Sequence, residues 1–576
     1  MRYTLRMLAT QQFERASFLT CALEFLRSTD EALGLGQEDI TIGLWLGNST
    51  TPNQPNELTQ RNGRFQQFLR NEVTNNPFPV TYCPWCGCTL YNGNANHGYH
   101  NLGTLQCINP SCHFHRHNLP ISYIDECIYH TPPTLLFSTV DKFALVYRED
   151  AARLLRRGNG YRSPDLIIQD ELHLISGALG SMVGLFESVV EEMIATGGRR
   201  PKIVASTATT RNTSELVQKL YHREVRVFPA QGLDYSDNYF SHVEKDALRR
   251  HIGIMPIGKN TSNAVEIRLA ATLVLSRIKL ALNYLREYGI DPNDLEAVIG
   301  ALYQDGNLPP ILDLYWSIVL YFNSLKDLGR SNSRTSQEVY ETLRTQLRKM
   351  TDYPQLKFLI EGFDKRKTEF TSREDSARIR PLMTRAETPT RLHQEENHRL
   401  RVSMDSLDLI YASNMISVGI DISRWNMMLM VGQPRSAAEY IQSSSRVARS
   451  HSGVVINLLN PFRIREFSLF ENYTSFHNAY YRYVEPLSIT PLTSEMLRQN
   501  IMNNMIRCYR AYVFPHDEIE VVNGEIVERL SERFQADEYL IGEIEGTVEE
   551  YVEGNNYASS LRYVSPDCWV NIAQRI

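Results

Sequence analysis

The sequence lacks any long hydrophobic run. No apolar stretch approaches the roughly 18–20 residues that a helix needs to cross a bilayer, and the start, MRYTLRMLATQQF, has no apolar region like that of a secretory signal. Cysteine is also scarce, with nine residues in 576, and this excludes a small disulfide scaffold. We therefore expect a cytoplasmic protein with no membrane partner.

The composition is sufficient for several globular domains. With 576 residues, of which 42% are hydrophobic and 22% charged, the chain is too long for one hydrophobic core. The same composition excludes a mainly disordered chain and a collagen-like fibre.

The net charge of −6 is unevenly distributed along the chain. Thirteen acidic residues lie between Asp517 and Glu553 with only two basic ones, Arg529 and Arg533, so this segment carries −11 and leaves +5 on the rest. A slightly basic body is compatible with a nucleic-acid partner. The acidic segment is either a solvated terminal extension or an autoinhibitory tail that competes with nucleic acid.

Short apolar runs alternate with helical patterns in two parts of the chain. Strands are expected in the first part at 3–5, 134–140, 165–168 and 202–205, and in the second part at 407–411, 427–431 and 454–458. Such alternation predicts an α/β fold with parallel sheets and with functional residues at the carboxyl ends of the strands.

Two adjacent carboxylates, Asp170 and Glu171, follow the strand expected at 165–168. Clustered acids are costly without a cation. A Mg²⁺–nucleotide complex would give them roles, because Asp170 could hold Mg²⁺ while Glu171 orients or deprotonates the attacking water. By itself the motif at 170–173 is too short to be specific, and a polar loop after a strand is the alternative interpretation.

Two arginines, Arg446 and Arg449, follow the second set of expected strands. If the segment is helical, their spacing puts both guanidinium groups on one helix face. Arginine suits the recognition of phosphate because its fork is planar and always charged. A solvated helix face is the alternative.

The order and spacing of these motifs resemble those of superfamily-2 helicases over roughly residues 1–490. The segment 170–173 is similar to the DExH Walker B motif, 206–209 to the S-A-T coupling motif and 417–421 to motif V. The segment 442–449 is similar to motif VI, Q-x-x-G-R-x-x-R, with Ser445 where that family often has Gly. The segments 138–143 and 321–325 resemble the strand-contacting motif of the first domain and motif IV.

A narrower resemblance is to the helicase subunits of DISARM-type bacterial antiphage systems, the DrmA family. It rests on 1–6, 11–13, 139–143, 170–184 and 462–466, with His477, Tyr480 and Tyr481. This resemblance implies an ATP-driven DNA translocase that works beside a partner subunit, DrmB.

The helicase resemblance implies roles for individual residues. The implied catalytic residues are Asp170, Glu171, His173, Arg446 and Arg449, the two arginines serving as γ-phosphate sensor and finger. His173 would couple the nucleotide site to the second domain, although a buried histidine is as good an interpretation of its local sequence. The implied nucleotide-binding residues are Gly419, Asp421 and Gln442, and the implied coupling residues are Ser206, Thr207 and Thr209.

A nucleic-acid surface would combine hydroxyls, amides and a few cations, which bind phosphates without reading sequence. The candidates are Arg6, Thr10, Gln11, Thr139, Lys142, Phe143 and Ser417. The sequence evidence for each of these candidates is weak when taken alone. A phenylalanine such as Phe143 is more often a core residue than a base-stacking platform.

The phosphate-binding loop G-x-x-x-x-G-K-[ST] occurs nowhere in the sequence. In the family this loop precedes the block that matches residues 1–13, so the chain is expected to start just after it and to bind ATP poorly alone. A second polypeptide could supply the loop, the sequence could be a fragment, or ATP use could be lost. We favour the first two explanations, in which the first sheet lacks a central strand and has an exposed edge for a partner to cover.

Four cysteines, Cys83, Cys86, Cys107 and Cys112, have the spacing C-x2-C-x20-C-x4-C. In a cytosolic protein this array predicts a structural Zn²⁺ site, with a disulfide pair as the alternative. Cys88, His113 or His115 could replace a ligand.

These observations predict two RecA-like domains, the first incomplete. The expected segments are a first domain at 1–230 with a zinc ribbon at about 78–118, a helical linker at 231–310, a second domain at 311–490 with an insertion at about 330–400, and a helical acidic extension at 491–576. The leading hypothesis is a helicase-type ATPase that uses ATP, Mg²⁺ and structural Zn²⁺, binds DNA and is completed by a P-loop-bearing polypeptide. The alternative is a non-hydrolysing nucleic-acid-binding scaffold, while a nuclease is disfavoured because DELH lacks further acids at nuclease spacing.

Overall fold

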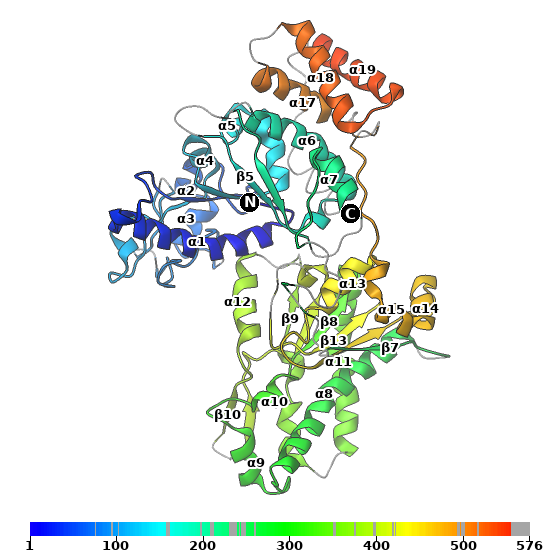
Figure 1. The fold of residues 1–576 in the computed structure, drawn as a ribbon. Helices are drawn as coiled ribbons and strands as arrows, with labels where there is room; N and C mark the ends of the chain where they lie inside the picture. Colours follow the sequence, from blue (N-terminus) through cyan, green and yellow to red (C-terminus); the bar gives the residue numbers. More distant parts are fainter. Residues whose placement is uncertain are drawn as a thin grey trace. The chain divides into compact units, whose positions relative to one another are not determined.

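A computed structural model describes most of the chain (Figure 1). The described residues are 1–74, 76–93, 96–101, 103–156, 162–195, 198–207, 212–229, 239–240, 242, 249–258, 261–349, 353–371, 373, 376–395, 399–417, 420, 422–491, 493, 496, 501–514 and 518–554. They form two compact units, one built from 1–228 with 486–576 and the other from 229–485. No helix among these residues is long and apolar enough to cross a membrane.

The first unit contains a parallel sheet of six strands in the order β3-β2-β4-β1-β5-β6. The strands are β1 (Arg2–Tyr3), β2 (Ile42–Trp45), β3 (Ile121–Ser122), β4 (Leu135–Thr139), β5 (Leu166–Gln169) and β6 (Lys202–Ala205). The expected strands at 134–140, 165–168 and 202–205 are confirmed as β4, β5 and β6. Because all pairings are parallel, the polar residues that follow these strands lie at one edge of the sheet.

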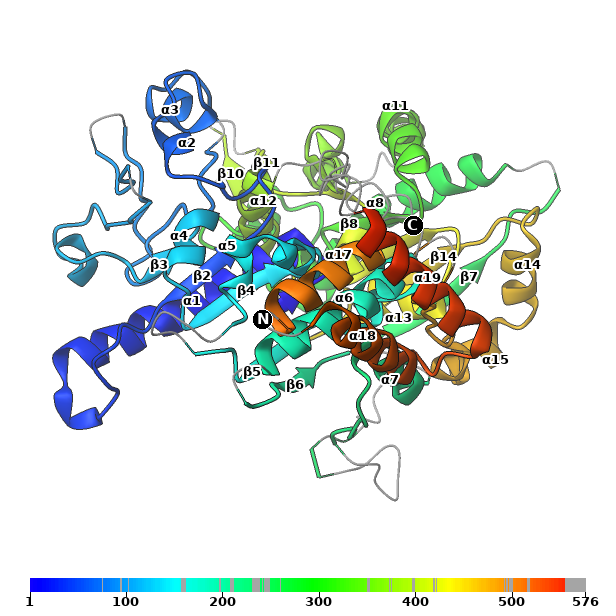
Figure 2. The same cartoon turned by 90° about the horizontal axis from the view of Figure 1, so that it is seen from above.

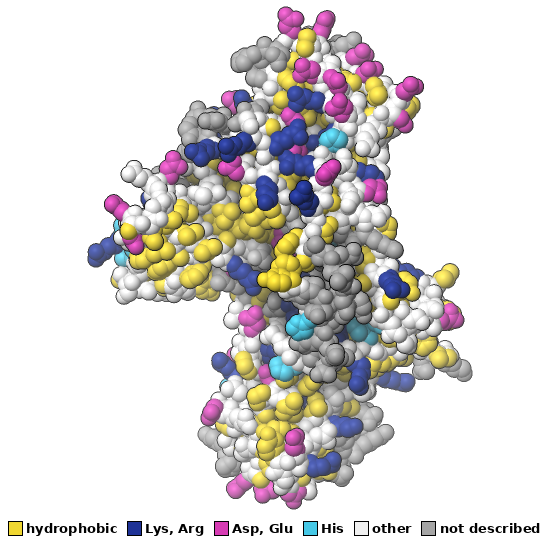
Figure 3. Space-filling view, viewed as in Figure 1, with side chains coloured by type: hydrophobic (Ala, Val, Ile, Leu, Met, Phe, Trp, Pro, Cys, Tyr) yellow, Lys and Arg dark blue, Asp and Glu magenta, His cyan; other side chains and the backbone are white. Residues whose placement is uncertain are grey.

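Helices connect and cover the first sheet. They are α1 (Arg6–Thr29), α2 (Asn56–Thr59), α3 (Arg64–Leu69), α4 (Asp125–His130), α5 (Glu149–Ala152), α6 (Gly177–Ala195) and α7 (Thr213–Tyr221). Buried side chains of α6 pack against Ile167 of β5 in the main core cluster of this unit. The outer face of α1 is apolar, with Phe18, Leu19 and Leu26 exposed, and Figure 3 shows hydrophobic side chains gathered over this helix.

The C-terminal helices pack on the first unit. They are α17 (Ile501–Cys508), α18 (Ile519–Phe534) and α19 (Glu538–Gly554), and Figure 2 shows them beside α6. Ile526 and Leu530 enter the core, while the two basic residues pair with α6, Arg529 with Glu192 at 2.7 Å and Arg533 with Glu191 at 3.7 Å. The described part of the acidic segment therefore packs on the first unit through its apolar and basic residues.

The second unit also contains a parallel six-stranded sheet, in the order β7-β14-β13-β8-β12-β9. The strands are β7 (Arg249–Ile254), β8 (Ile318–Phe322), β9 (Lys367–Phe370), β12 (Leu409–Ala412), β13 (Met427–Val431) and β14 (Gly453–Leu458). A hairpin of β10 (Leu392–Gln394) and β11 (Leu400–Val402) lies outside this sheet. The expected strands at 407–411, 427–431 and 454–458 are confirmed as β12, β13 and β14.

Eight α-helices of the second unit are described. They are α8 (Ser262–Glu287), α9 (Leu295–Leu302), α10 (Pro310–Asp313), α11 (Leu325–Lys349), α12 (Ser376–Glu387), α13 (Ala437–Ser444), α14 (Ile464–Glu471) and α15 (Tyr473–Asn478).

Two segments differ from their expected organisation. The segment 231–310, expected as a linker, supplies β7 to the edge of the second sheet and α8 to the core beneath it. The segment 330–400, expected as an insertion, supplies β9 to the other edge and most of α11, which packs on α8. Both segments are rich in polar residues, but Val274, Val339 and Leu343 supply the apolar contacts that bind them to the core.

A buried ion cluster joins four segments at the amino ends of β8, β9 and β12. Asp408, fully buried, accepts hydrogen bonds from Arg277 of α8 at 3.0 Å and from Arg366 at 2.8 and 3.1 Å. The Trp316 indole donates to the same carboxylate at 2.6 Å, and the Arg277 guanidinium lies 3.9 Å from the centre of that ring. Each of the two cations is therefore partly neutralised and hydrogen-bonded, as a buried charge requires.

Replacement of Asp408 by Ala is expected to destabilise the second unit by about 3–5 kcal/mol, because it leaves two buried arginines without their shared anion. Urea unfolding followed by circular dichroism measures this loss. Asp405, exposed and three residues earlier, is the matched control, and its replacement by Ala is expected to change stability by less than about 0.5 kcal/mol. Equal stability of the two variants would contradict a structural role for the cluster.

Candidate nucleotide site and zinc centre

The Asp170–His173 motif lies at the carboxyl end of β5. Asp170 and Glu171 are half-buried and His173 is buried, with its Nδ1 3.3 Å from Glu171 Oε2. Glu171 has a φ of 51°, in the left-handed region that a residue with a side chain rarely adopts. This backbone turns the chain sharply out of the strand into the short 3₁₀ helix Leu172–Leu174, the kind of strain often found at functional sites.

The segment after β6 is bonded directly to this motif. The Ser206 hydroxyl donates to Asp170 Oδ1, which also accepts from Glu171 N at 2.9 Å, and Leu172 N donates to Ser206 O at 2.9 Å. A displacement of the segment after β6 would therefore move the Asp170 motif with it. Coupling between the two segments requires such a direct connection. Thr207 follows, exposed, and Thr209 lies outside the described residues.

The turn that carries Arg446 and Arg449 differs from the expected helix. Helix α13 ends at Ser444, before both arginines, and Ala448 has a φ of 55°. The prediction that the two guanidinium groups share a helix face is therefore wrong. The helix stops because Ala448 N donates to Trp425 O, which draws the chain back toward the start of β13.

The two arginines have different surroundings in the second unit. The half-buried Arg446 donates to the Ser417 carbonyl and, at 2.9 Å, to the Ile420 carbonyl, so it fixes the segment after β12. Arg449 is exposed, and its Nε donates to Ser445 O at 3.3 Å. Gln442 is half-buried on α13, while Gly419 and Asp421 lie outside the described residues.

Arg249, at the start of β7, also fixes this turn and has no signal in the sequence. Its Nε donates to Val447 O at 3.0 Å and its Nη2 to Ser445 O at 3.4 Å. Burial lowers the pKa of this guanidinium, although an arginine stays charged at neutral pH. Because Arg249 precedes the turn by about 200 residues, only the pairing of β7 with β14 brings them together.

Replacement of Arg446 by Ala is expected to loosen the segment after β12, because it removes two hydrogen bonds to the Ser417 and Ile420 carbonyls. Peptides that contain these residues should exchange their amide hydrogens faster. The same substitution at the exposed Arg449 should leave that exchange unchanged. Equal exchange in both variants would show that Arg446 does not hold the segment.

Three nucleic-acid candidates lie on the first two turns of α1, at the end of β1. Arg6 donates to Ser49 Oγ at 2.6 Å, and Thr10 donates to Arg6 O at 3.0 Å, with Gln11 half-buried beside them. Arg64 at the start of α3 binds the same loop, donating to Asn48 O and Ser49 O at 2.6 Å each. The sequence gives no signal for Arg64, because this residue belongs to no motif.

Lys142 and Phe143 belong to the core of the first unit. The Lys142 ammonium lies 2.8 Å from Asp125, with both side chains buried, and Phe143 packs edge-on against Trp45 and under the Arg2 guanidinium. Their assignment to a nucleic-acid surface is corrected, since a buried paired cation and a covered ring cannot contact a strand in this conformation. Thr139 and Ser417 are also buried.

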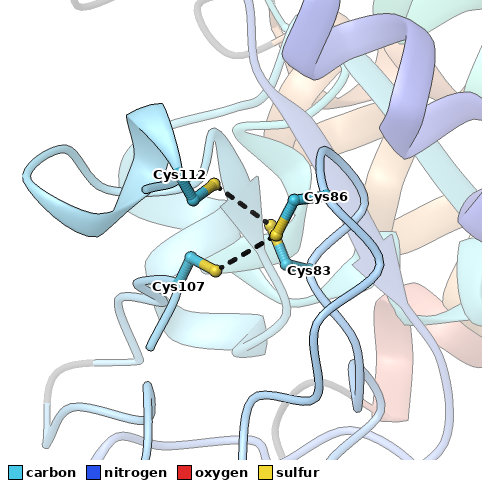
Figure 4. Close-up of side chains that lie close together, drawn as sticks. All are labelled: Cys83, Cys86, Cys107 and Cys112. Carbon is cyan, nitrogen blue, oxygen red and sulfur yellow. Dashed lines mark hydrogen bonds between the residues drawn. The ribbon is translucent and has the colours of Figure 1, made fainter. Parts of the chain in front are cut away.

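The four cysteines of the expected zinc ribbon converge. Their sulfur atoms all lie within 4.8 Å of one another, with Cys83 3.9 Å from Cys112 and Cys86 3.4 Å from Cys107 (Figure 4). Burial raises the pKa of Cys83, Cys107 and Cys112 to about 12, so the thiolates need a cation to form. Four convergent thiolates suit tetrahedral Zn²⁺.

The ribbon packs on α1 through aromatic contacts. Phe25 of α1 has its ring centre 5.0 Å from that of Trp85 and 4.8 Å from that of His113. Because Trp85 lies between the first two cysteines and His113 follows the last, both cysteine-bearing turns contact the helix. The ribbon therefore stabilises α1, whose other end carries Arg6 and Thr10.

The chain is expected to bind one Zn²⁺ per molecule, measured by elemental analysis of purified protein. Replacement of Cys107 by Ser should remove the metal and lower the melting temperature, because a three-thiolate site cannot close its tetrahedron. Cys127, a half-buried cysteine outside the cluster, is the control, and its replacement by Ser should retain zinc. Zinc retained by the Cys107 variant would exclude that ligand.

Comparison with known proteins agrees with this geometry. Residues 345–451 match the helicase conserved C-terminal domain. The chain is 33% identical over 536 residues to the DISARM protein DrmA of Bacillus paralicheniformis, an alignment that covers 86% of this chain and 44% of the relative. The chain thus spans less than half the length of that relative.

Solved structures show similarity at low identity. They include the DUF1998 helicase MrfA bound to DNA, with a TM-score of 0.45 and 13% identity over 91% of this chain and 57% of that one. Another is the Mycobacterium smegmatis helicase Lhr bound to single-stranded DNA and AMP-PNP, with a TM-score of 0.39 and 13% identity over 86% and 50% of the two chains. The chain thus has two units with parallel six-stranded sheets, matches the helicase conserved C-terminal domain over residues 345–451 and is similar to DrmA over 86% of its own length.

Proposed function

We propose that the chain is the motor portion of an ATP-dependent DNA helicase or translocase of a bacterial antiphage defence system, completed by a P-loop-bearing polypeptide. That polypeptide is either a partner chain or a further part of the same protein. The observation that carries this proposal is the edge of the first sheet at β6, beside the Asp170 motif, which no other described strand covers.

The edge at β6 has the features of an incomplete sheet. Among the described strands, β6 pairs only with β5. Lys202 N and Ser206 N donate to Asp165 O and Gln169 O on that side, and since alternate residues face opposite edges, the amides of Ile203 and Ala205 point away from β5. Unpaired backbone groups of this kind accept a further strand.

Two apolar side chains on the sheet face beside this edge are exposed. Leu166 of β5 and Val204 of β6 are 48% and 45% exposed. Parallel sheets are normally covered on both faces, so apolar residues on a bare face indicate a missing layer. A strand that carries a P-loop and continues into a helix would supply both the paired edge and the cover.

The residues around this edge fit a role in ATP hydrolysis. Asp170, half-buried at the strand end, would hold Mg²⁺, and Glu171 would orient and deprotonate the attacking water. ATP and Mg²⁺ would supply the phosphoryl group and its charge neutralisation. In the second unit the exposed Arg449 would contact the γ-phosphate, and Arg446 would hold the segment after β12 in place.

The nucleic acid would lie across the carboxyl edge of the first sheet, where Arg6 and Arg64 both donate to Ser49 of the loop after β2. DrmA is a DISARM protein, and we extend its setting to this chain, with a DrmB-like subunit as a further partner. Because Arg6 and Arg64 would contact phosphates, binding should weaken as the salt concentration rises.

In the completed enzyme, replacement of Glu171 by Gln is expected to lower DNA-stimulated ATP turnover by about 100-fold or more, because an amide cannot take the proton of water. DNA binding should be unchanged. Glu215, exposed on α7, is the control, and its replacement by Gln should retain turnover.

Full turnover by the Glu171 variant would remove this residue from the base role. A completed complex that binds DNA and never hydrolyses ATP would instead identify a nucleic-acid-binding scaffold.

A further inference from the structure

The turn after β14 holds two large apolar side chains in solvent. Phe462 is 93% exposed and Ile464 is 88% exposed, the latter at the first position of α14. Such exposure of neighbouring large apolar residues is unusual in a folded chain and indicates a surface that contacts another molecule.

A polar frame fixes this turn. Phe462 N donates to Asn460 Oδ1 at 3.0 Å, and Asn460 N donates to Glu466 Oε2 at 2.7 Å. Glu466 is buried, and its Oε1 accepts from Arg463 Nη1 at 2.9 Å. The exposed side chains therefore stand on an ordered backbone, so little conformational entropy is lost when they bind.

The turn continues into the carboxyl edge of the second sheet. A Cβ on Gly432, which follows β13, would lie 3.0 Å from Asn323 Nδ2 and 3.4 Å from Arg463 Nη1. The ends of β8, β13 and β14 thus meet here.

Beside them lies a cavity of about 190 Å³ whose lining includes Arg330, Arg334 and Arg463. Its acids are Glu266, Asp327, Glu338 and Glu466; Glu266 accepts from Ser331, Asp327 lies 3.8 Å from Arg330, and Glu466 is paired with Arg463. The cavity is therefore not cationic, and the cation of the turn itself is Arg463, whose side chain is 54% exposed.

We propose that this turn is a strand-contacting site, at which Phe462 stacks on a base of single-stranded nucleic acid, Ile464 packs beside it and Arg463 contacts the adjoining phosphate. The inference rests on the proposed nucleic-acid function and adds a site outside the helicase motifs. An exposed aromatic ring next to cations is the chemistry by which proteins bind single strands without reading sequence. A protein partner would also bury the apolar pair, but the exposed Arg463 between Phe462 and Ile464 favours a partner that carries phosphate.

The test uses the full chain and fluorescein-labelled oligothymidylate, with an abasic oligonucleotide of equal length as the second probe. Replacement of Phe462 by Ala should weaken oligothymidylate binding by about 5- to 100-fold, the range measured for base–aromatic stacking. Binding to the abasic probe should stay unchanged, because that probe has phosphates and no bases. Replacement of Arg463 by Ala should weaken binding to both probes.

Tyr288, 65% exposed at the end of α8, is the matched control, and its replacement by Ala should change neither affinity. The variant Phe462→Trp adds a direct readout, since a stacked base quenches indole fluorescence and an abasic strand does not.

Equal affinity of wild type and the Phe462→Ala variant for oligothymidylate would show that Phe462 does not stack on a base, and would favour a protein partner for this turn. Unquenched indole fluorescence of the Phe462→Trp variant in its complex with oligothymidylate would exclude base stacking in the same way. A wild-type chain that binds neither probe would overturn the proposed nucleic-acid function itself.

Discussion

The parallel direction of every pairing in the two six-stranded sheets is the constraint on which the rest of the molecule depends. Parallel strands gather their carboxyl ends at one edge, so the Ser206 hydroxyl donates to Asp170 although the two residues are far apart in sequence. A parallel sheet also needs cover on both faces, and an edge strand has unpaired backbone groups. Among the described strands, β3, β6, β7 and β9 are edges. The proposed P-loop-bearing polypeptide would pair with β6, because apolar side chains lie exposed beside this edge.

The amino edge of the second sheet is stabilised by buried charge. Asp408 accepts from Arg277, Arg366 and Trp316, and so joins α8 to the starts of three strands. Arg249, at the start of β7, lies at the same edge and donates to the Val447 carbonyl, while Arg446 donates to the Ile420 carbonyl after β12. Buried and half-buried arginines thus fix the segments that connect the strands of this sheet.

The sequence predicted the strands that carry apolar runs, the convergence of four cysteines and the joint position of Asp170 and Ser206, because each depends on local pattern or on parallel order. Zinc as the ion that these cysteines bind stays a prediction. It could not predict that α13 ends before Arg446, since a hydrogen bond to the distant Trp425 carbonyl decides this. Nor could it show that Lys142 and Phe143 are buried, because their partners Asp125 and Trp45 come from other segments. The role of Arg249 and the exposure of Phe462 likewise follow from tertiary packing alone.

Hydrogen exchange at the outward-facing amides of β6, Ile203 and Ala205, shows whether another polypeptide pairs with this edge. We expect fast exchange in the chain alone and strong protection when a P-loop-bearing polypeptide is added, together with the appearance of DNA-stimulated ATP hydrolysis. Hydrolysis at a full helicase rate by the chain alone, or hydrolysis in the complex with the β6 amides still exchanging freely, would contradict this expectation.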